Sequence, residues 1–182
     1  GDIGICSFYA TKMISSGGQG GAVISRHKTL IDQIVDYRNF DNREDDRRRF
    51  NFQMTDVQAA IGRVQNSRLN EFIERREEIF DRYKSADIPL IDSSDCDTAP
   101  VRYRAVALND KPEALIAHFA QHGIVAINPM RESELLDQGH NYPNALELSR
   151  KTVSLPIYPS MSDEDVTRVI NAFNEFQTGE LQ

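Results

Sequence analysis

The feature that most constrains the fold of this 182-residue chain is a continuous helix-forming stretch over residues 55–86. Thr55 offers an N-cap hydroxyl and Gln58 follows three residues later, which is the spacing of a capping box. Apolar residues then recur at helical spacing along the whole stretch, with one slip before Leu69. A helix of roughly thirty residues is about 45 Å long, more than the width of a small domain. The stretch therefore predicts one long helix that links two lobes.

The segment before this helix predicts two short strands around a glycine-rich loop. Residues 3–8 and 21–25 are apolar and β-prone, and the loop between them carries Lys12 and three glycines. Such a glycine density is typical of unusual backbone angles or of a close backbone approach. Residues 27–38 follow helical spacing, and residues 39–50 are polar and predict a loop.

The segment after the long helix predicts an alternation of strands and helices. Residues 92–100 form a turn-rich connection, and strands are expected over 101–108, 124–127 and 153–155. A helix begins at Pro112 and ends before Gly123, a short helix covers 145–150, and Ser162 caps a last helix. This order predicts an α/β or α+β lobe.

Composition excludes several classes of protein. The net charge of −7 disfavours nucleic acid as a partner, because an acidic chain follows a phosphate backbone poorly. No apolar run reaches the length of a membrane span, and no signal peptide precedes the first predicted strand, so we expect a soluble, cytoplasmic protein with no membrane partner. The two cysteines, Cys6 and Cys96, are expected to be free thiols.

Lys12 is the residue that most invites a chemical interpretation. It follows a predicted strand, where the scaffold can hold it while a ligand still reaches it. A lysine amine attacks carbonyl compounds, and hydroxyls or glycine N–H groups nearby can hold a phosphate. Four hydroxyl residues lie close in sequence: Ser7, Thr11, Ser15 and Ser16. Taken by itself, however, a lysine after a strand is more often a solvated surface residue.

Three sequence blocks together resemble the DegT/StrS family of aminotransferases that use pyridoxal 5′-phosphate (PLP). The first runs from Gly1 through Ser7-Phe8 to Lys12 and the glycine loop. The second, residues 50–62, resembles the family's Asn-aromatic-x-Met-Ser/Thr-x-x-Gln-Ala-Ala segment. The third, residues 155–165, resembles its C-terminal signature. The first two blocks are the specific ones, and all three occur in the family's order.

The resemblance implies a role for three residues. Lys12 matches the lysine that binds the PLP aldehyde covalently and later moves a proton between substrate and cofactor. Ser7 matches the serine that contacts the PLP phosphate. Asn51 matches an asparagine that reaches the phosphate in the neighbouring subunit, which implies a homodimer with a shared active site. Family members transfer an amino group, usually from glutamate, to a keto sugar linked to a nucleotide diphosphate.

The resemblance also implies an architecture and a truncation. It assigns residues 1–54 to a remnant of the large domain of PLP-transferase fold type I, 55–86 to an interdomain helix, and 87–182 to a small α+β domain. The family's cofactor-pairing aspartate lies upstream of the lysine, so we expect this chain to be a C-terminal fragment with little activity alone. A non-catalytic dimerisation or regulatory module derived from such an enzyme is the alternative. A sugar dehydratase is disfavoured, because those relatives carry histidine in place of Lys12.

Other polar residues receive more ordinary interpretations. Arg47, Arg48 and Arg49 offer positive charge to a nucleotide diphosphate, but the acidic residues before them favour a solvated surface loop. Gln53 departs from the Arg or Lys of many family members, so no anion contact is assigned to it. The four histidines, His27, His118, His122 and His140, show no metal-ligand spacing in the sequence, and we expect no metal site.

Overall fold

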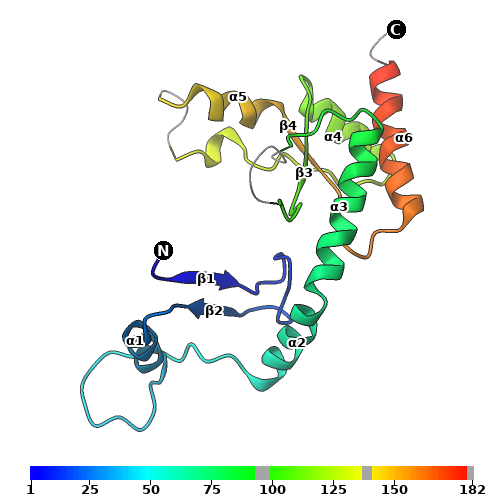
Figure 1. Ribbon diagram of the computed structural model, residues 1–182. Coiled ribbons are helices and arrows are strands. Elements are labelled where there is room, and N and C mark those ends of the chain that lie inside the picture. Colours follow the sequence, from blue (N-terminus) through cyan, green and yellow to red (C-terminus); the bar gives the residue numbers. More distant parts are fainter. Residues whose placement is uncertain (93–98, 137–140, 180–182) are drawn as a thin grey trace. The chain divides into compact units, whose positions relative to one another are not determined.

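The computed structural model describes residues 1–92, 99–136 and 141–179. Two compact units make up the chain, unit 1 over Gly1–Asn70 and unit 2 over Glu71–Gln182 (Figure 1). Cys96 and His140 lie outside the described residues, as does most of the predicted 92–100 connection. Within the described residues, no helix combines the length and the apolar character needed to cross a membrane.

Unit 1 contains a two-stranded antiparallel sheet and two helices. Strand β1 (Gly4–Ser7) pairs with β2 (Gly21–Ile24), in a register that places Gly4 opposite Ile24 and Ser7 opposite Gly21. Helix α1 spans Lys28–Arg38 and α2 spans Asp56–Ser67. The capping box at the start of α2 is confirmed: the Thr55 hydroxyl accepts the Gln58 N–H, and the Gln58 side chain accepts the Thr55 N–H.

Unit 1 has no hydrophobic interior. Of residues 1–70, all of which the structure describes, only Ser16 is buried. Ile5 is 82 % exposed on β1, and Ile24 on β2 is also exposed. A two-stranded sheet with open faces is marginal on its own, so the local turns and caps, rather than a packed core, define this unit.

The helix predicted over 55–86 is two helices. Helix α2 ends at Ser67, Arg68 takes a non-helical position, and α3 runs over Leu69–Ser85. The Ser67 hydroxyl donates to the Val64 carbonyl at 2.8 Å, a local bond that competes with helical pairing. The break coincides with the slip in the apolar spacing before Leu69, so the slip marked a boundary rather than an irregular helix face.

Unit 2 is built on a small antiparallel sheet. Strand β3 (Ala105–Leu108) pairs with β4 (Thr152–Leu155), and single bridges add Leu90 beside β3 and Ile127 beside β4. The strand predicted over 101–108 begins only at Ala105, because Arg102 adopts a positive φ of 45°. The strand predicted over 124–127 is reduced to the bridge at Ile127.

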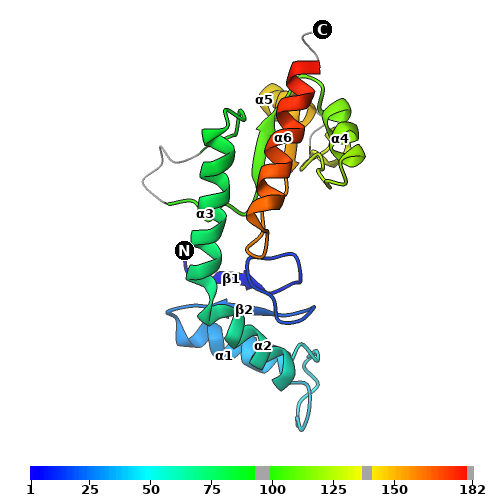
Figure 2. The same ribbon diagram turned by 90° about the vertical axis from the view of Figure 1, so that its right-hand side faces the viewer.

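Among its described residues, unit 2 also has four α-helices and a 3-10 turn. They are α3, α4 (Pro112–Gln121), the 3-10 turn Glu132–Glu134, α5 (Pro143–Lys151) and α6 (Asp163–Gly179). Figure 2 shows α6 between α3 and α4. Asp163, at the start of α6, accepts hydrogen bonds from Arg75 and Arg82 of α3, both at 2.8 Å. The helix boundaries at Pro112, Gly123 and Ser162 follow the sequence prediction.

Most of the buried apolar residues in the described part of unit 2 form one core. Ile79, Tyr83, Leu115, Phe119 and Val153 are among its fully buried members. These side chains come from α3, α4 and β4, so the core joins the helices to the sheet.

A buried arginine stabilises the edge of this core. Arg76 donates to the carbonyls of Arg102, Tyr103 and Ile157 at 3.3, 3.2 and 2.8 Å. Burial lowers the pKa of this guanidinium from its ordinary value. Its bonds tie α3 to the segments before β3 and after β4.

Candidate active site

Lys12 lies in the loop between β1 and β2. Backbone hydrogen bonds within the loop hold it closed. The Phe8 N–H donates to the Gly20 carbonyl at 2.8 Å, and the Ala10 N–H donates to the Gly18 carbonyl at 3.0 Å. At the tip, the Lys12 N–H donates to the Tyr9 carbonyl at 2.9 Å and so forms a tight turn. The hairpin therefore holds the Lys12 backbone although no core surrounds it.

The side chains of Lys12 and Ser7 are both open to a ligand. Each is exposed, and the Lys12 ammonium makes no hydrogen bond or ion pair with any residue of the described chain. The Ser7 hydroxyl, at the end of β1, accepts only a long 3.4 Å bond from the Tyr9 N–H. The Lys12 amine and the Ser7 hydroxyl, which make few other polar contacts, thus lie on one short segment.

Ser16 fixes the same loop to helix α2. Its side chain is fully buried, its N–H donates to the Phe8 carbonyl at 3.0 Å, and its hydroxyl has no hydrogen-bond partner. A Cβ added at Gly62 would lie 2.8 Å from this hydroxyl, and one added at Gly20 would lie 3.1 Å from it. Glycine at position 62 lets the loop approach α2 this closely, and glycine at position 20 leaves room for Ser16 within the loop.

This contact predicts that Gly62→Val loosens the Lys12 loop. A valine side chain overlaps the Ser16 hydroxyl, and overpacking at a close contact typically costs about 1–3 kcal/mol. Hydrogen exchange of the amides of residues 8–20 is expected to accelerate. Gly179→Val is the matched control, because a Cβ at Gly179 meets nothing within 4 Å. Unchanged exchange in Gly62→Val would show that α2 does not hold the loop.

Asn51 is held by aromatic residues on either side. The Phe50 N–H donates to the Tyr37 carbonyl at 3.1 Å, and the Phe52 N–H donates to the Phe50 carbonyl at 3.1 Å, which closes a three-residue turn centred on Asn51. The rings of Phe50 and Phe52 stack with centroids 5.1 Å apart. Asn51 itself is exposed, and no hydrogen bond joins it to Lys12 or Ser7 in the described chain.

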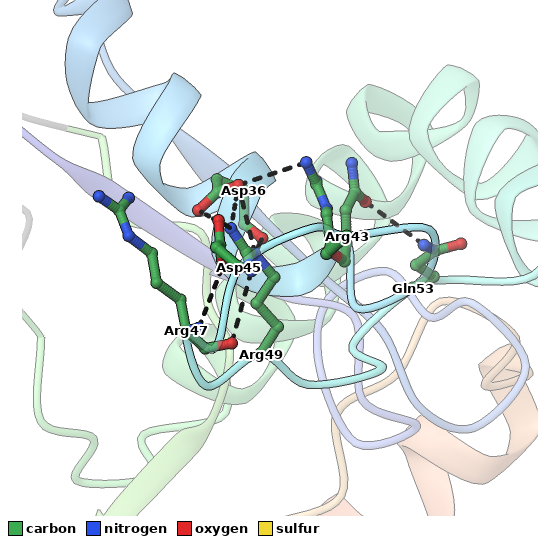
Figure 3. A network of polar contacts seen from close by, with 7 residues as sticks. Asp36, Arg43, Asp45, Arg47, Arg49 and Gln53 are labelled. Atoms are coloured by element: carbon green, nitrogen blue, oxygen red, sulfur yellow. Dashed lines mark hydrogen bonds and ion pairs between the residues drawn. The ribbon is translucent and has the colours of Figure 1, made fainter.

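The arginine-rich loop before Asn51 is occupied by its own acidic residues (Figure 3). The Arg49 guanidinium, whose side chain is 5 % exposed, binds Asp36 of α1 at 3.0 Å and Asp45 at 2.6 Å. The hydrogen bond from Arg49 holds the pKa of the Asp45 carboxyl well below its usual range. Arg49 therefore positions the loop rather than offering charge to a ligand.

The remaining polar residues of this loop have simpler contacts. Gln53 donates to the Asn39 side-chain oxygen at 3.3 Å (Figure 3). The Arg48 guanidinium lies 5.2 Å from the centroid of the Phe50 ring. The structure thus groups Lys12 with Ser7 on one hairpin and places Asn51 in a separate turn. Sequence reasoning counted Ser16 among the hydroxyls that can hold a phosphate, whereas the structure buries its side chain completely. It missed the contact of Ser16 with Gly62, although a glycine inside a helical pattern is a known signal of close approach.

Comparison with known proteins gives consistent matches along the chain. The model of the DegT/DnrJ/EryC1/StrS aminotransferase family matches residues 1–174. The spore coat polysaccharide biosynthesis protein SpsC of Bacillus subtilis is 30 % identical, over 98 % of this chain and 54 % of SpsC. GDP-perosamine synthase of Escherichia coli O157:H7 is 29 % identical, over 97 % of this chain and 52 % of that enzyme.

A solved structure agrees with these sequence matches. DesV of S. venezuelae, determined in complex with a ketimine intermediate, superimposes with a TM-score of 0.84 at 25 % identity. The match covers 96 % of this chain and 51 % of DesV. The fold is therefore of the α/β class and corresponds to the C-terminal portion of such structures. The chain spans about half the length of the relatives that it matches.

Proposed function

Because this chain belongs to the DegT/DnrJ/EryC1/StrS aminotransferase family, we propose that it carries the lysine-bearing part of a PLP-dependent sugar aminotransferase. The proposed reaction moves an amino group, with glutamate as donor, to a keto sugar linked to a nucleotide. The observation that carries the proposal is the Lys12 amine, held at the tip of the β1–β2 hairpin without a hydrogen-bond or ion-pair partner in the described chain.

The residues on this hairpin suit the chemistry of PLP. The cofactor has an aldehyde, which a primary amine can bind, and a phosphate, which accepts hydrogen bonds from hydroxyl groups. Lys12 and Ser7 offer these two groups, both exposed and five positions apart in sequence. When bound, PLP supplies the electron sink for the electron pair left at the substrate carbon.

In this proposal Lys12 has two tasks. It holds the cofactor by its side-chain nitrogen, and it then carries a proton to and from the carbon that gains or loses the amino group. For the second task the amine must move between positions during the reaction. A long, flexible side chain at a hairpin tip allows this movement. The bond between the Lys12 N–H and the Tyr9 carbonyl fixes the backbone from which that side chain extends.

Ser7 and Asn51 are proposed to bind the cofactor phosphate from two subunits. The Ser7 hydroxyl donates within its own subunit, and the Asn51 amide donates to the site of a second copy. The turn centred on Asn51 and its flanking stacked rings support this role, because they fix the backbone while the side chain stays exposed. The active unit is then a homodimer whose sites each need both chains.

The test of the function is amino transfer by this chain together with any sequence that its gene encodes before Gly1. The protein is supplied with PLP, glutamate and a panel of nucleotide-linked keto sugars, and 2-oxoglutarate is measured. Production that depends on both the sugar and PLP supports the proposal. If no sugar stimulates 2-oxoglutarate production and PLP does not bind, the chain is instead a non-catalytic dimerisation or regulatory module.

The shared site has its own test. Lys12→Ala and Asn51→Ala are each expected to be nearly inactive as homodimers. Mixing the two variants under conditions that exchange subunits should restore activity, because one site of the mixed dimer then has both Lys12 and Asn51 intact. Asn66→Ala, an exposed asparagine of the same unit, is the matched control and should keep full activity. The absence of recovery after verified exchange contradicts the shared site.

A further inference from the structure

Two histidines and a glutamate of unit 2 meet between helices α4 and α6. His118 lies in α4 and His122 caps its C-terminal end, so the four-residue spacing places both on one side of the helix. Glu175 comes from α6, which packs against α4 (Figure 2). One ring nitrogen of each histidine and one carboxylate oxygen of Glu175 all lie within 4.8 Å of one another.

Backbone carbonyls determine which ring nitrogens carry protons. His122 Nδ1 lies 3.1 Å from the His118 carbonyl, and His118 Nε2 lies 2.9 Å from the Ala172 carbonyl. Because a carbonyl oxygen only accepts, both of these nitrogens must donate. In a neutral imidazole the other nitrogen then presents a lone pair. Histidines that bind metals are typically oriented by such a bond from the second nitrogen.

The contact between His122 and Glu175 brings a ring nitrogen against a carboxylate oxygen. His122 Nε2 lies 3.0 Å from a Glu175 carboxylate oxygen. With Nδ1 already donating, a neutral His122 would set a lone pair of Nε2 against a lone pair of the carboxylate. Two things remove this repulsion: a proton on Nε2, which makes the contact an ion pair, or a metal cation that both atoms bind. From this arrangement we propose that His118, His122 and Glu175 bind a divalent transition-metal ion of the zinc type.

The surroundings suit a cation with an open coordination position. His122 and Glu175 line a surface groove with Glu164. Two other charged residues of that lining are already paired: Asp163 with Arg75 and Arg82, and Arg168 with Asp165 at 2.6 Å. The site also lies at the C-terminal end of α4, where the helix dipole favours positive charge. Water can reach the ion from the groove.

Little movement is needed to bring the ligands into place. Tetrahedral zinc with bonds of about 2.0–2.2 Å keeps its ligand atoms roughly 3.4 Å apart. His118 is positioned by its contact with the Phe176 ring, 5.5 Å between centroids, and by the Ala172 carbonyl. The Glu175 side chain is 61 % exposed and free to rotate toward the two rings. Three protein ligands and a water would then clamp α4 to α6.

The test is a calorimetric titration of the tag-free chain, first treated with a chelator, with Zn²⁺ and with Mg²⁺. One Zn²⁺ per chain and no Mg²⁺ binding are expected, because imidazole nitrogens suit zinc and not the harder magnesium ion. His122→Ala and Glu175→Gln should each weaken zinc binding by at least about tenfold, the least that losing even an outer-shell partner costs. The exposed Glu175 position makes Glu175→Gln safe for folding.

Matched controls separate this site from adventitious zinc. His27→Ala removes an exposed histidine of unit 1 and Glu164→Gln removes a groove carboxylate, and both should bind zinc as the parent chain does. The titrations use a background in which both cysteines, Cys6 and Cys96, are serine, which excludes thiol binding. Absence of one-to-one binding, or equal affinity in the parent, His122→Ala and Glu175→Gln, would overturn the proposal.

Discussion

Lys12→Ala is expected to abolish covalent attachment of PLP and to lower the rate of amino transfer by about 10²–10⁴-fold, the range for losing a positioned acid–base group. The reason is that no other amine replaces it: the structure places Lys12 alone at the tip of the β1–β2 hairpin, and the next lysine in sequence is Lys28. Treatment with PLP and borohydride followed by intact-mass measurement reports attachment, and 2-oxoglutarate formation reports the rate.

Lys28→Ala is the control for this experiment. Lys28 is an exposed lysine of the same unit, and its ammonium is paired with Asp32 at 2.6 Å. The variant should retain both the cofactor adduct and the activity. Peptide mapping of the reduced adduct to Lys12 completes the assignment. An adduct that persists in Lys12→Ala, or maps to another lysine, would remove the basis of the proposed function.

Leu115→Ala is expected to destabilise unit 2 by about 2–5 kcal/mol, the usual cost of removing a buried leucine side chain. Leu115 has no exposed surface and lies in the core between α4 and the β3–β4 sheet. The core is closely packed around it, so the lost volume leaves a cavity that the surrounding helices cannot fully close. Urea unfolding followed by circular dichroism measures the change.

Leu136→Ala is the matched substitution for Leu115→Ala. Leu136 belongs to the same unit and is fully exposed. Its truncation removes the same atoms without opening a cavity, so the change should stay within about 0.5 kcal/mol. Equal destabilisation by the two variants would mean that the packing around α4 is not as described.

The sequence predicted the helices of unit 2 more accurately than its strands. Pro112, Gly123 and Ser162 act locally, through backbone angles and a side-chain cap, so their effects can be read from neighbouring residues. The start of β3 depends instead on Arg102. Its positive φ accompanies bonds from its side chain to Glu77 and Asp92, and such distant partners leave no local signal.

In the candidate site, too, local features could be predicted from the sequence and contacts between distant residues could not. The hairpin that carries Lys12 follows from two β-prone runs around a glycine-rich loop, all of which is local information. The burial of Ser16 against Gly62 joins residues from different elements, and the meeting of His118 and His122 with Glu175 requires α4 and α6 to pack. The three-domain assignment and the roles of Ser7, Lys12 and Asn51 stay predictions.

The lack of buried apolar side chains in unit 1 affects what a thermal melt of this chain can report. The heat capacity and the denaturant m-value of unfolding scale with the surface newly exposed to water. Unit 1 already keeps Ile5 and Ile24 in solvent and the core lies in unit 2, so unit 2 contributes the larger part of both quantities. A ligand of the α4–α6 groove should therefore shift the calorimetric transition, while a ligand of the hairpin can bind without moving it.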